Sequence, residues 1–373
     1  MIRFVRDWKK KHPRIVYTFY LFVMVIVLSE IALRIFVTWD PAYYVGFSDP
    51  APNTVIEYPY GIIKYNSDRF ADDEFEKIKT RPRVAYFGDS VCYGVGAGYG
   101  YRISELLEDT YPQYAHLNLT GGLDTDMSMD MAEKYLQLAG RFDVDVAVYL
   151  MNLNDIGPYN ADQPDQRLAV FRVGALFDWL RGRSYLYTYL RFAVKNTVVR
   201  LGCTQSGHKQ VELYPNEFRD EFEATAERIN SVGRRLSDHG IGFVVLILPY
   251  EMQISREAAE TYRELDIGWG DSFLDRGPQK LLINLLNEAV VIDGYNAFID
   301  PEHAAADWNA YGVGECFVYN RGDKIDWNHP NRKGHRLLAD FIARTGVLPT
   351  AIKKKHDASS DSQTSEIAPP GEE

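Results

Sequence analysis

Five short apolar segments that alternate with helical stretches constrain the fold of this chain most strongly. The segments are RVAYFG, YAHLNL, DVAVYLM, GFVVLILP and VVID, and they lie between residues 83 and 293. Their nearly continuous hydrophobicity is typical of strands that are buried on both faces of a parallel sheet. Helical patterns occur near residues 101–110, 127–140, 216–239, 255–265, 279–288 and 333–345. This alternation predicts an α/β fold of three layers, in which helices cover both faces of a central parallel sheet.

The N-terminal run from Ile15 to Phe36 is long and apolar enough to cross a membrane. As a helix it would extend about 33 Å, which exceeds the thickness of a bilayer core. Glu30 and Arg34 are four residues apart near its far end, so they share one helix face and can pair. An uncleaved signal peptide and a peripheral helix are the alternatives. No small-x-small cleavage site follows the run, which favours a retained transmembrane anchor over residues 15–37.

The charges beside the anchor predict its orientation. Residues 1–14 carry six Lys and Arg residues against the single acidic residue Asp7. Basic residues stay on the cytoplasmic side, so we expect residues 1–14 in the cytoplasm and the bulk of the chain in the periplasm or outside the cell. Residues 38–80 are expected to form a stalk and an entry segment that leads into the fold, and residues 81–350 one domain with an insertion at about 156–215. The polar tail, 351–373, is expected to be disordered.

Charge and cysteine content exclude several functional classes. The formal net charge is −11, which argues against a nucleic-acid-binding protein because such a protein needs a basic face. The cysteines Cys92, Cys203 and Cys316 include no CxxC pair, so no metal or redox cofactor is expected. Cys203 and Cys316 could pair in an oxidising compartment, although buried or idle thiols are the simpler interpretation.

Three polar clusters lie at the ends of predicted strands or before the last helix. They are Gly88-Asp89-Ser90, Asn152-Leu153-Asn154-Asp155 and Asp326-Trp327-Asn328-His329-Pro330. Each cluster alone is better explained by capping or turn formation. Together they supply a nucleophile, an amide that can donate to an oxyanion, and an imidazole with a carboxylate three residues before it. This combination predicts acyl transfer through a serine.

The segments FGDSVCYGVGAG, NLTGGLDTDM, NLND and DWNHPNRKGHRLLADFI resemble the four sequence blocks of the SGNH (GDSL) hydrolase superfamily, in scattered stretches from about residue 83 to 345. The resemblance implies the flavodoxin-like fold of that family, with Ser90 as nucleophile and first oxyanion donor. It also implies that His329 is the base and Asp326 its partner.

The same resemblance implies two more oxyanion donors, the backbone N–H of Gly122 and the side-chain amide of Asn154. Two departures from the family pattern affect them. Asn152 stands where the family usually has glycine. The glycine block is also shorter than usual, so Gly121 remains an alternative to Gly122.

Three functions are compatible with these features. The first is an extracytoplasmic serine esterase or deacylase, which removes an acyl group from an acylated carbohydrate or envelope ester through a Ser90 acyl-enzyme. The second is an O-acyltransferase that passes an acetyl group from the same acyl-enzyme to a polysaccharide hydroxyl. The third is a non-catalytic envelope scaffold or glycan-binding module, which would not need Ser90, Asp326 and His329 together. The carbohydrate substrate is inferred from the resemblance and the expected topology.

Overall fold

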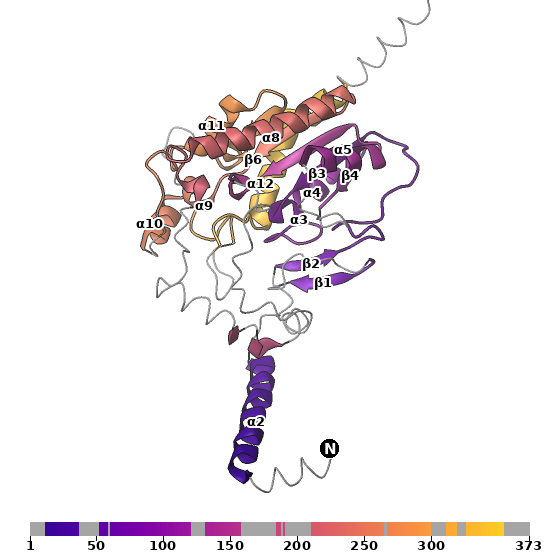
Figure 1. The fold of residues 1–373 in the computed structure, drawn as a ribbon. Helices are drawn as coiled ribbons and strands as arrows, with labels where there is room; N and C mark the ends of the chain where they lie inside the picture. Colours follow the sequence, from indigo (N-terminus) through magenta and orange to yellow (C-terminus); the bar gives the residue numbers. More distant parts are fainter. Residues whose placement is uncertain are drawn as a thin grey trace, which may run out of the picture. The chain divides into compact units, whose positions relative to one another are not determined.

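The computed structural model describes residues 12–36, 52–58, 60–120, 131–157, 184–187, 189–190, 210–264, 267–299, 311–318 and 326–353. The chain divides into two compact units (Figure 1). The anchor unit contains Met1–Ser48 and Asp165–His208, and the sheet unit contains Asp49–Pro164 and Lys209–Glu373.

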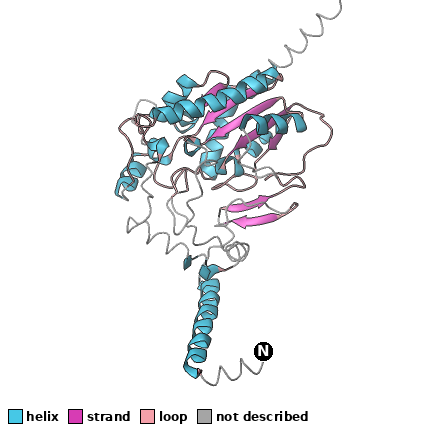
Figure 2. Cartoon of the chain, viewed as in Figure 1, coloured by secondary structure: helices cyan, strands magenta, loops and turns pink. Residues whose placement is uncertain are grey.

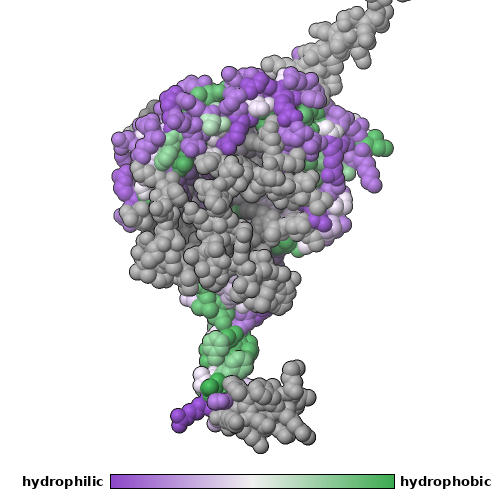
Figure 3. All heavy atoms as spheres, viewed as in Figure 1, coloured by the Kyte–Doolittle hydropathy of each residue, from purple (hydrophilic) through white to green (hydrophobic). Residues whose placement is uncertain are grey.

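The anchor unit is built on helix α2 (Pro13–Phe36), which has no buried residues. Among the described residues, α2 is the one helix long and apolar enough to cross a membrane. Figure 3 shows its apolar surface in green. The predicted ion pair is present, with Arg34 Nε 2.8 Å from Glu30 Oε1.

The sheet unit contains the predicted parallel sheet. All five expected strands are present, and they are β3 (Arg83–Gly88), β4 (Ala115–Asn118), β5 (Val146–Met151), β6 (Gly242–Ile247) and β7 (Val290–Asp293). They lie in the order β4-β3-β5-β6-β7, and each neighbouring pair is parallel. This is the flavodoxin-like order, in which the first strand has the second and third strands on either side. Ligand sites in such sheets form outside the carboxyl ends of the strands, at this switch point.

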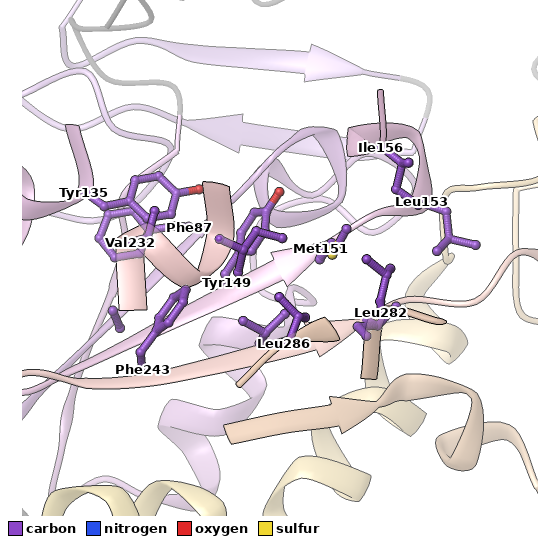
Figure 4. Packing of buried hydrophobic residues seen from close by; sticks show 14 of the residues in the cluster. Phe87, Tyr135, Tyr149, Met151, Leu153, Ile156, Val232, Phe243, Leu282 and Leu286 are labelled. Carbon is purple, nitrogen blue, oxygen red and sulfur yellow. The ribbon is translucent and has the colours of Figure 1, made fainter. Parts of the chain in front are cut away.

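Helices cover both faces of the sheet, as predicted. The helices are α3 (Ser90–Tyr93), α4 (Ile103–Thr110), α5 (Met131–Arg141), α8 (Arg219–Asp238), α9 (Glu251–Ile254), α10 (Arg256–Glu264), α11 (Gly277–Leu285) and α12 (Arg332–Thr345). One apolar core joins the sheet to α5, α8 and α11, and part of it is shown in Figure 4. A second core joins the opposite face to α3, α4 and α12. Successive strand side chains point to opposite faces, so Tyr86 lies in the second core and Phe87 in the first.

A hairpin lies within the expected stalk and entry segment. Strands β1 (Val55–Tyr58) and β2 (Gly61–Lys64) pair antiparallel, apart from the main sheet, as Figure 2 shows. Ile63 of β2 is buried and packs with Tyr93 of α3 in a third, smaller core. Within the expected stalk and entry segment, the residues from Val55 onward thus include a hairpin that packs on the fold. Residues 37–51 lie outside the described residues.

Three other expectations concern the insertion, the tail and the cysteines. The insertion is described only in short pieces, including 184–187 and 189–190. Residues 351–353 are helical, and the rest of the expected disordered tail lies outside the described residues. Cys316 is a free, buried thiol, and Cys203 lies outside the described residues.

Candidate active site

Ser90 lies at a sharp turn between β3 and α3, at the carboxyl edge of the sheet. Gly88 ends the strand with φ of +154°, and a Cβ there would lie 2.7 Å from the Leu150 carbonyl oxygen. Asp89 caps the helix, because its Oδ1 accepts the N–H of Val91 at 3.0 Å. A glycine that allows the turn and a carboxylate that caps α3 therefore place Ser90 at the first position of a helix.

The loop that carries His329 is held from two directions. The N–H of Val318 donates to the His329 carbonyl at 2.9 Å, next to a bridge between Phe317 and Pro330. From the other direction, the N–H of Glu251 donates to the Trp327 carbonyl at 2.9 Å. These backbone bonds restrict the loop on both sides of the imidazole.

Asn331 then begins α12. Its side chain accepts the N–H groups of Lys333 and Gly334, as expected of a helix cap. The cap joins the loop to a long helix that packs on the sheet, so the imidazole is carried by a rigid element.

Ser90, His329 and Asp326 form a continuous chain of hydrogen bonds. The Oγ of Ser90 lies 2.7 Å from His329 Nε2, and His329 Nδ1 lies 2.8 Å from both carboxylate oxygens of Asp326. Asp326 is 2% exposed and His329 is 8% exposed. A buried carboxylate that accepts the Nδ1 proton leaves Nε2 as an acceptor for the serine proton. The fold thus brings together two groups that are 239 residues apart in the sequence.

Asp89 and Asp155 place two further carboxyls near the serine. Asp89 Oδ2 lies 3.0 Å from Ser90 Oγ, so it competes with His329 for the single hydroxyl proton, but the contact with His329 is shorter. Burial raises the pKa of Asp155 well above its usual range, and the negative charge of Asp89 raises it further.

Of the two further oxyanion donors expected besides Ser90, the structure describes the asparagine but not the glycine. Gly121 and Gly122 lie outside the described residues. Asn154 lies in the short 3-10 helix η2 (Leu153–Asp155), directly after β5, and is exposed. Strand β5 is the neighbour of β3, with Leu150 opposite Gly88, so η2 follows the strand beside the nucleophile turn. Asn152 is fully buried, and neither atom of its amide has a hydrogen-bond partner among the described residues.

Asn118 bridges the nucleophile helix and the glycine block, and the sequence did not reveal this role. Its Nδ2 donates to the Cys92 carbonyl at 2.8 Å, and its Oδ1 accepts the N–H of Thr120 at 3.2 Å. Thr120 directly precedes Gly121. Asn118 is 1% exposed, so its polar atoms depend on these partners.

Asp72 binds the backbone of Asn118 and is itself paired with Arg102. Asp72 Oδ2 accepts the N–H of Asn118 at 2.7 Å, and Asp72 Oδ1 lies 3.6 Å from Arg102 Nη2. Arg102 is 1% exposed and also pairs with Glu105 and donates to the Ala71 carbonyl. Burial raises the pKa of Asp72 to about 7, although the charge of Arg102 and the backbone N–H bonds oppose this rise.

Possible metal ligands and the thiol nearest to Ser90 are the other groups to consider among the described residues. No group of three or more His, Cys, Asp and Glu side chains among the described residues could hold a metal ion. Cys92 lies two residues after Ser90, but burial raises the pKa of its thiol. A buried neutral thiol is a poor nucleophile.

No family model and no curated protein sequence matches this chain. Solved structures that resemble this chain at low identity include acetyl xylan esterases, a lipolytic protein of the G-D-S-L family from Desulfitobacterium hafniense and an acyltransferase. An acetyl xylan esterase, AlAXEase, is 13% identical, with 70% of this chain and 98% of that chain covered and a TM-score of 0.36. A catalytic mutant of the acetylxylan esterase Axe2 from Geobacillus stearothermophilus is 15% identical, with 72% and 95% covered and a TM-score of 0.35. The salicylyl-acyltransferase SsfX3 is 14% identical, with 74% and 58% covered and a TM-score of 0.35.

Proposed function

We propose that this chain is a serine esterase or deacylase of the SGNH type. The proposal is carried by the hydrogen-bonded chain from Ser90 through His329 to Asp326, with contacts of 2.7 and 2.8 Å. As Ser90 Oγ attacks the acyl carbonyl, His329 Nε2 takes the hydroxyl proton, and Asp326 stabilises the imidazolium that forms. The imidazolium then protonates the leaving alcohol, which leaves the acyl group on Ser90.

In the second half of the reaction, His329 Nε2 removes a proton from water as the water oxygen attacks the acyl carbonyl. The imidazolium then returns this proton to Ser90 Oγ as the bond between Ser90 and the acyl group breaks, which releases the acid. The oxyanion in both steps would accept hydrogen bonds from the Ser90 N–H, the Gly122 N–H and the Asn154 amide. Each such donor is worth roughly 3 kcal/mol in a transition state. An O-acyltransferase would differ only in the second half, where a sugar hydroxyl replaces water.

We further propose that the substrate is an acylated carbohydrate or envelope ester outside the cytoplasm. Support comes from α2, which is apolar throughout its central part, and from the basic residues that precede it. In this topology residues 1–14 are cytoplasmic, residues 15–37 span the membrane, and the domain over residues 81–350 is extracytoplasmic.

The test uses the full chain in detergent with soluble acetyl and longer acyl esters. Ser90→Ala and His329→Ala should each lower turnover by at least about 10³-fold, since each removes a member of a unit that acts together. The exposed residues Ser237 and His239 provide matched controls, and their alanine variants should keep wild-type turnover. Near-normal turnover by folded Ser90→Ala would refute the proposal.

The same assay separates hydrolysis from transfer. An oligosaccharide acceptor is added with the acyl donor, and free acid and acylated sugar are both quantified. Acid as the main product assigns the esterase. Acylated sugar that exceeds the acid, and that disappears in Ser90→Ala, assigns the O-acyltransferase instead.

A further inference from the structure

Glu30 lies at a depth in α2 where a charged side chain needs partners. It follows Arg14, the last basic residue before the apolar run, by 16 residues. At 1.5 Å per residue this distance is about 24 Å, short of the roughly 30 Å of a hydrocarbon core. With Arg14 at the inner surface, the Glu30 carboxylate lies just inside the outer surface, where an unpaired charge is costly.

The insertion supplies those partners. The Ser184 hydroxyl donates a hydrogen bond to the Glu30 carboxylate at 2.8 Å. The backbone N–H groups of Tyr185 and Leu186 donate to the same carboxylate at 3.1 and 2.9 Å. Arg34 adds its ion pair at 2.8 Å and lies over the Tyr185 ring, 5.2 Å from the centroid. These donors leave the Glu30 side chain only 21% exposed on an otherwise uncovered helix.

The donors fix the position of the segment that carries them. Because backbone N–H groups of Tyr185 and Leu186 reach the carboxylate directly, residues 184–186 lie at the depth of Glu30. Figure 1 shows the short helical pieces of residues 185–190 next to one end of α2. Tyr189 and Leu190, which follow, are 52% and 51% exposed. Exposed Tyr and Leu side chains are suited to the boundary between headgroups and acyl chains.

We propose that residues 184–187, 189 and 190 form a second membrane contact, seated in the outer interface of a lipid bilayer and held there by Glu30. The inference rests on the transmembrane topology given under the proposed function. Lipid is the expected occupant because this surface continues from α2, whose exposed apolar side chains lipid would cover.

The experiment measures the depth of spin labels on the full chain in phosphatidylcholine–phosphatidylglycerol liposomes. Cys203→Ala provides the background, because the other cysteines, Cys92 and Cys316, are buried. Single labels are placed at Leu190→Cys, at Val23→Cys in α2, and at Ile78→Cys, which is 77% exposed in the sheet unit. Power saturation with oxygen, which concentrates in lipid, and with a water-soluble nickel chelate reports the surroundings of each label.

We expect oxygen access at Val23 and Leu190 and nickel access at Ile78. Adding Glu30→Ala should move the Leu190 label to nickel access and leave the Val23 label in lipid. Nickel access at Val23 would overturn the topology and this inference together. Two other results would overturn this inference alone. One is oxygen access at Val23 together with nickel access at Leu190, and the other is shielding of Leu190 from both reagents.

Discussion

Replacing Asn118 by alanine should slow the reaction more than it weakens substrate binding. The Asn118 amide joins the Cys92 carbonyl in the nucleophile helix to the Thr120 N–H, at 2.8 and 3.2 Å. Ser90 lies in the helix on one side of this bridge, and Thr120, on the other side, directly precedes the glycine block in the sequence. Loss of the bridge would let the helix and the glycine block shift relative to each other, which weakens interactions made in the transition state rather than in the bound substrate.

The hydrogen bonds of Asn118 indicate how much stability and how much kcat the alanine variant should lose. Removal of the amide leaves the Cys92 carbonyl and the Thr120 N–H without this partner, and each buried group left unpaired costs about 1–3 kcal/mol, so we expect about 2–6 kcal/mol of lost stability. Complete loss of one oxyanion donor costs roughly 3 kcal/mol, or about 100-fold in kcat. A displaced donor should therefore lower kcat of Asn118→Ala by about 10- to 100-fold.

Asn230 in α8 offers a matched control. It is also a buried asparagine, with Nδ2 donating to the Leu285 carbonyl at 2.9 Å and Oδ1 accepting the Asn287 N–H at 3.0 Å. Asn230→Ala should lose similar stability but keep kcat. Urea unfolding and steady-state hydrolysis of a soluble acetyl ester measure the two quantities. Equal kcat in the two variants, or a change in KM alone for Asn118→Ala, would refute the reasoning.

Three other substitutions test separate parts of the account. Asp326→Asn removes the charge facing His329 Nδ1, so kcat should fall about 10⁴-fold, as in the serine protease triad, with an unchanged circular dichroism spectrum; a loss under about tenfold contradicts the role. Gly96 has φ of +91°, and a Cβ there would lie 2.5 Å from the Pro330 carbonyl oxygen. Gly96→Ala should therefore lower stability by about 1–3 kcal/mol, and an unchanged thermal midpoint would speak against this packing. Burial, and then the charge of Arg102, lower the pKa of His335 to about 3. The unfolded chain takes up this proton below about pH 6.5 and the folded chain does not, so stability falls as the pH drops from about 6.5 to 3. His335→Leu should weaken that fall in urea titrations at neutral and acid pH, and an equal fall in wild type and variant would contradict it.

The five-stranded sheet could be predicted from the sequence because its strands are apolar over nearly their whole length. Strand β5 is buried at every position, so its sequence is apolar throughout. The hairpin strands β1 and β2 have four residues each and are partly exposed, so they show no such run. Their packing depends on Tyr93 and Val95, which are distant in the sequence. A local sequence pattern does not indicate contacts between residues that are far apart in the chain.

The same contrast applies to the site. Ser90 and His329 were predictable because each lies in a short motif beside a strand end or helix start. Asn118 and Glu251 were not, because their roles depend on contacts across the fold. Asn118 reaches Cys92, 26 residues away, and the Glu251 side chain accepts the Gly314 N–H at 2.6 Å, 63 residues away. In the sequence they are a polar residue inside a strand and an acidic residue after one.

The most direct test of the central claim is covalent labelling of the full chain by a fluorophosphonate, followed by peptide mass spectrometry. Because Ser90 Oγ lies 2.7 Å from His329 Nε2, the serine should be activated as a nucleophile. We predict a single adduct on the peptide that contains Ser90, no adduct in Ser90→Ala, and much slower labelling in His329→Ala. Absence of the adduct from folded wild-type protein, or equal labelling rates in wild type and His329→Ala, would contradict the account.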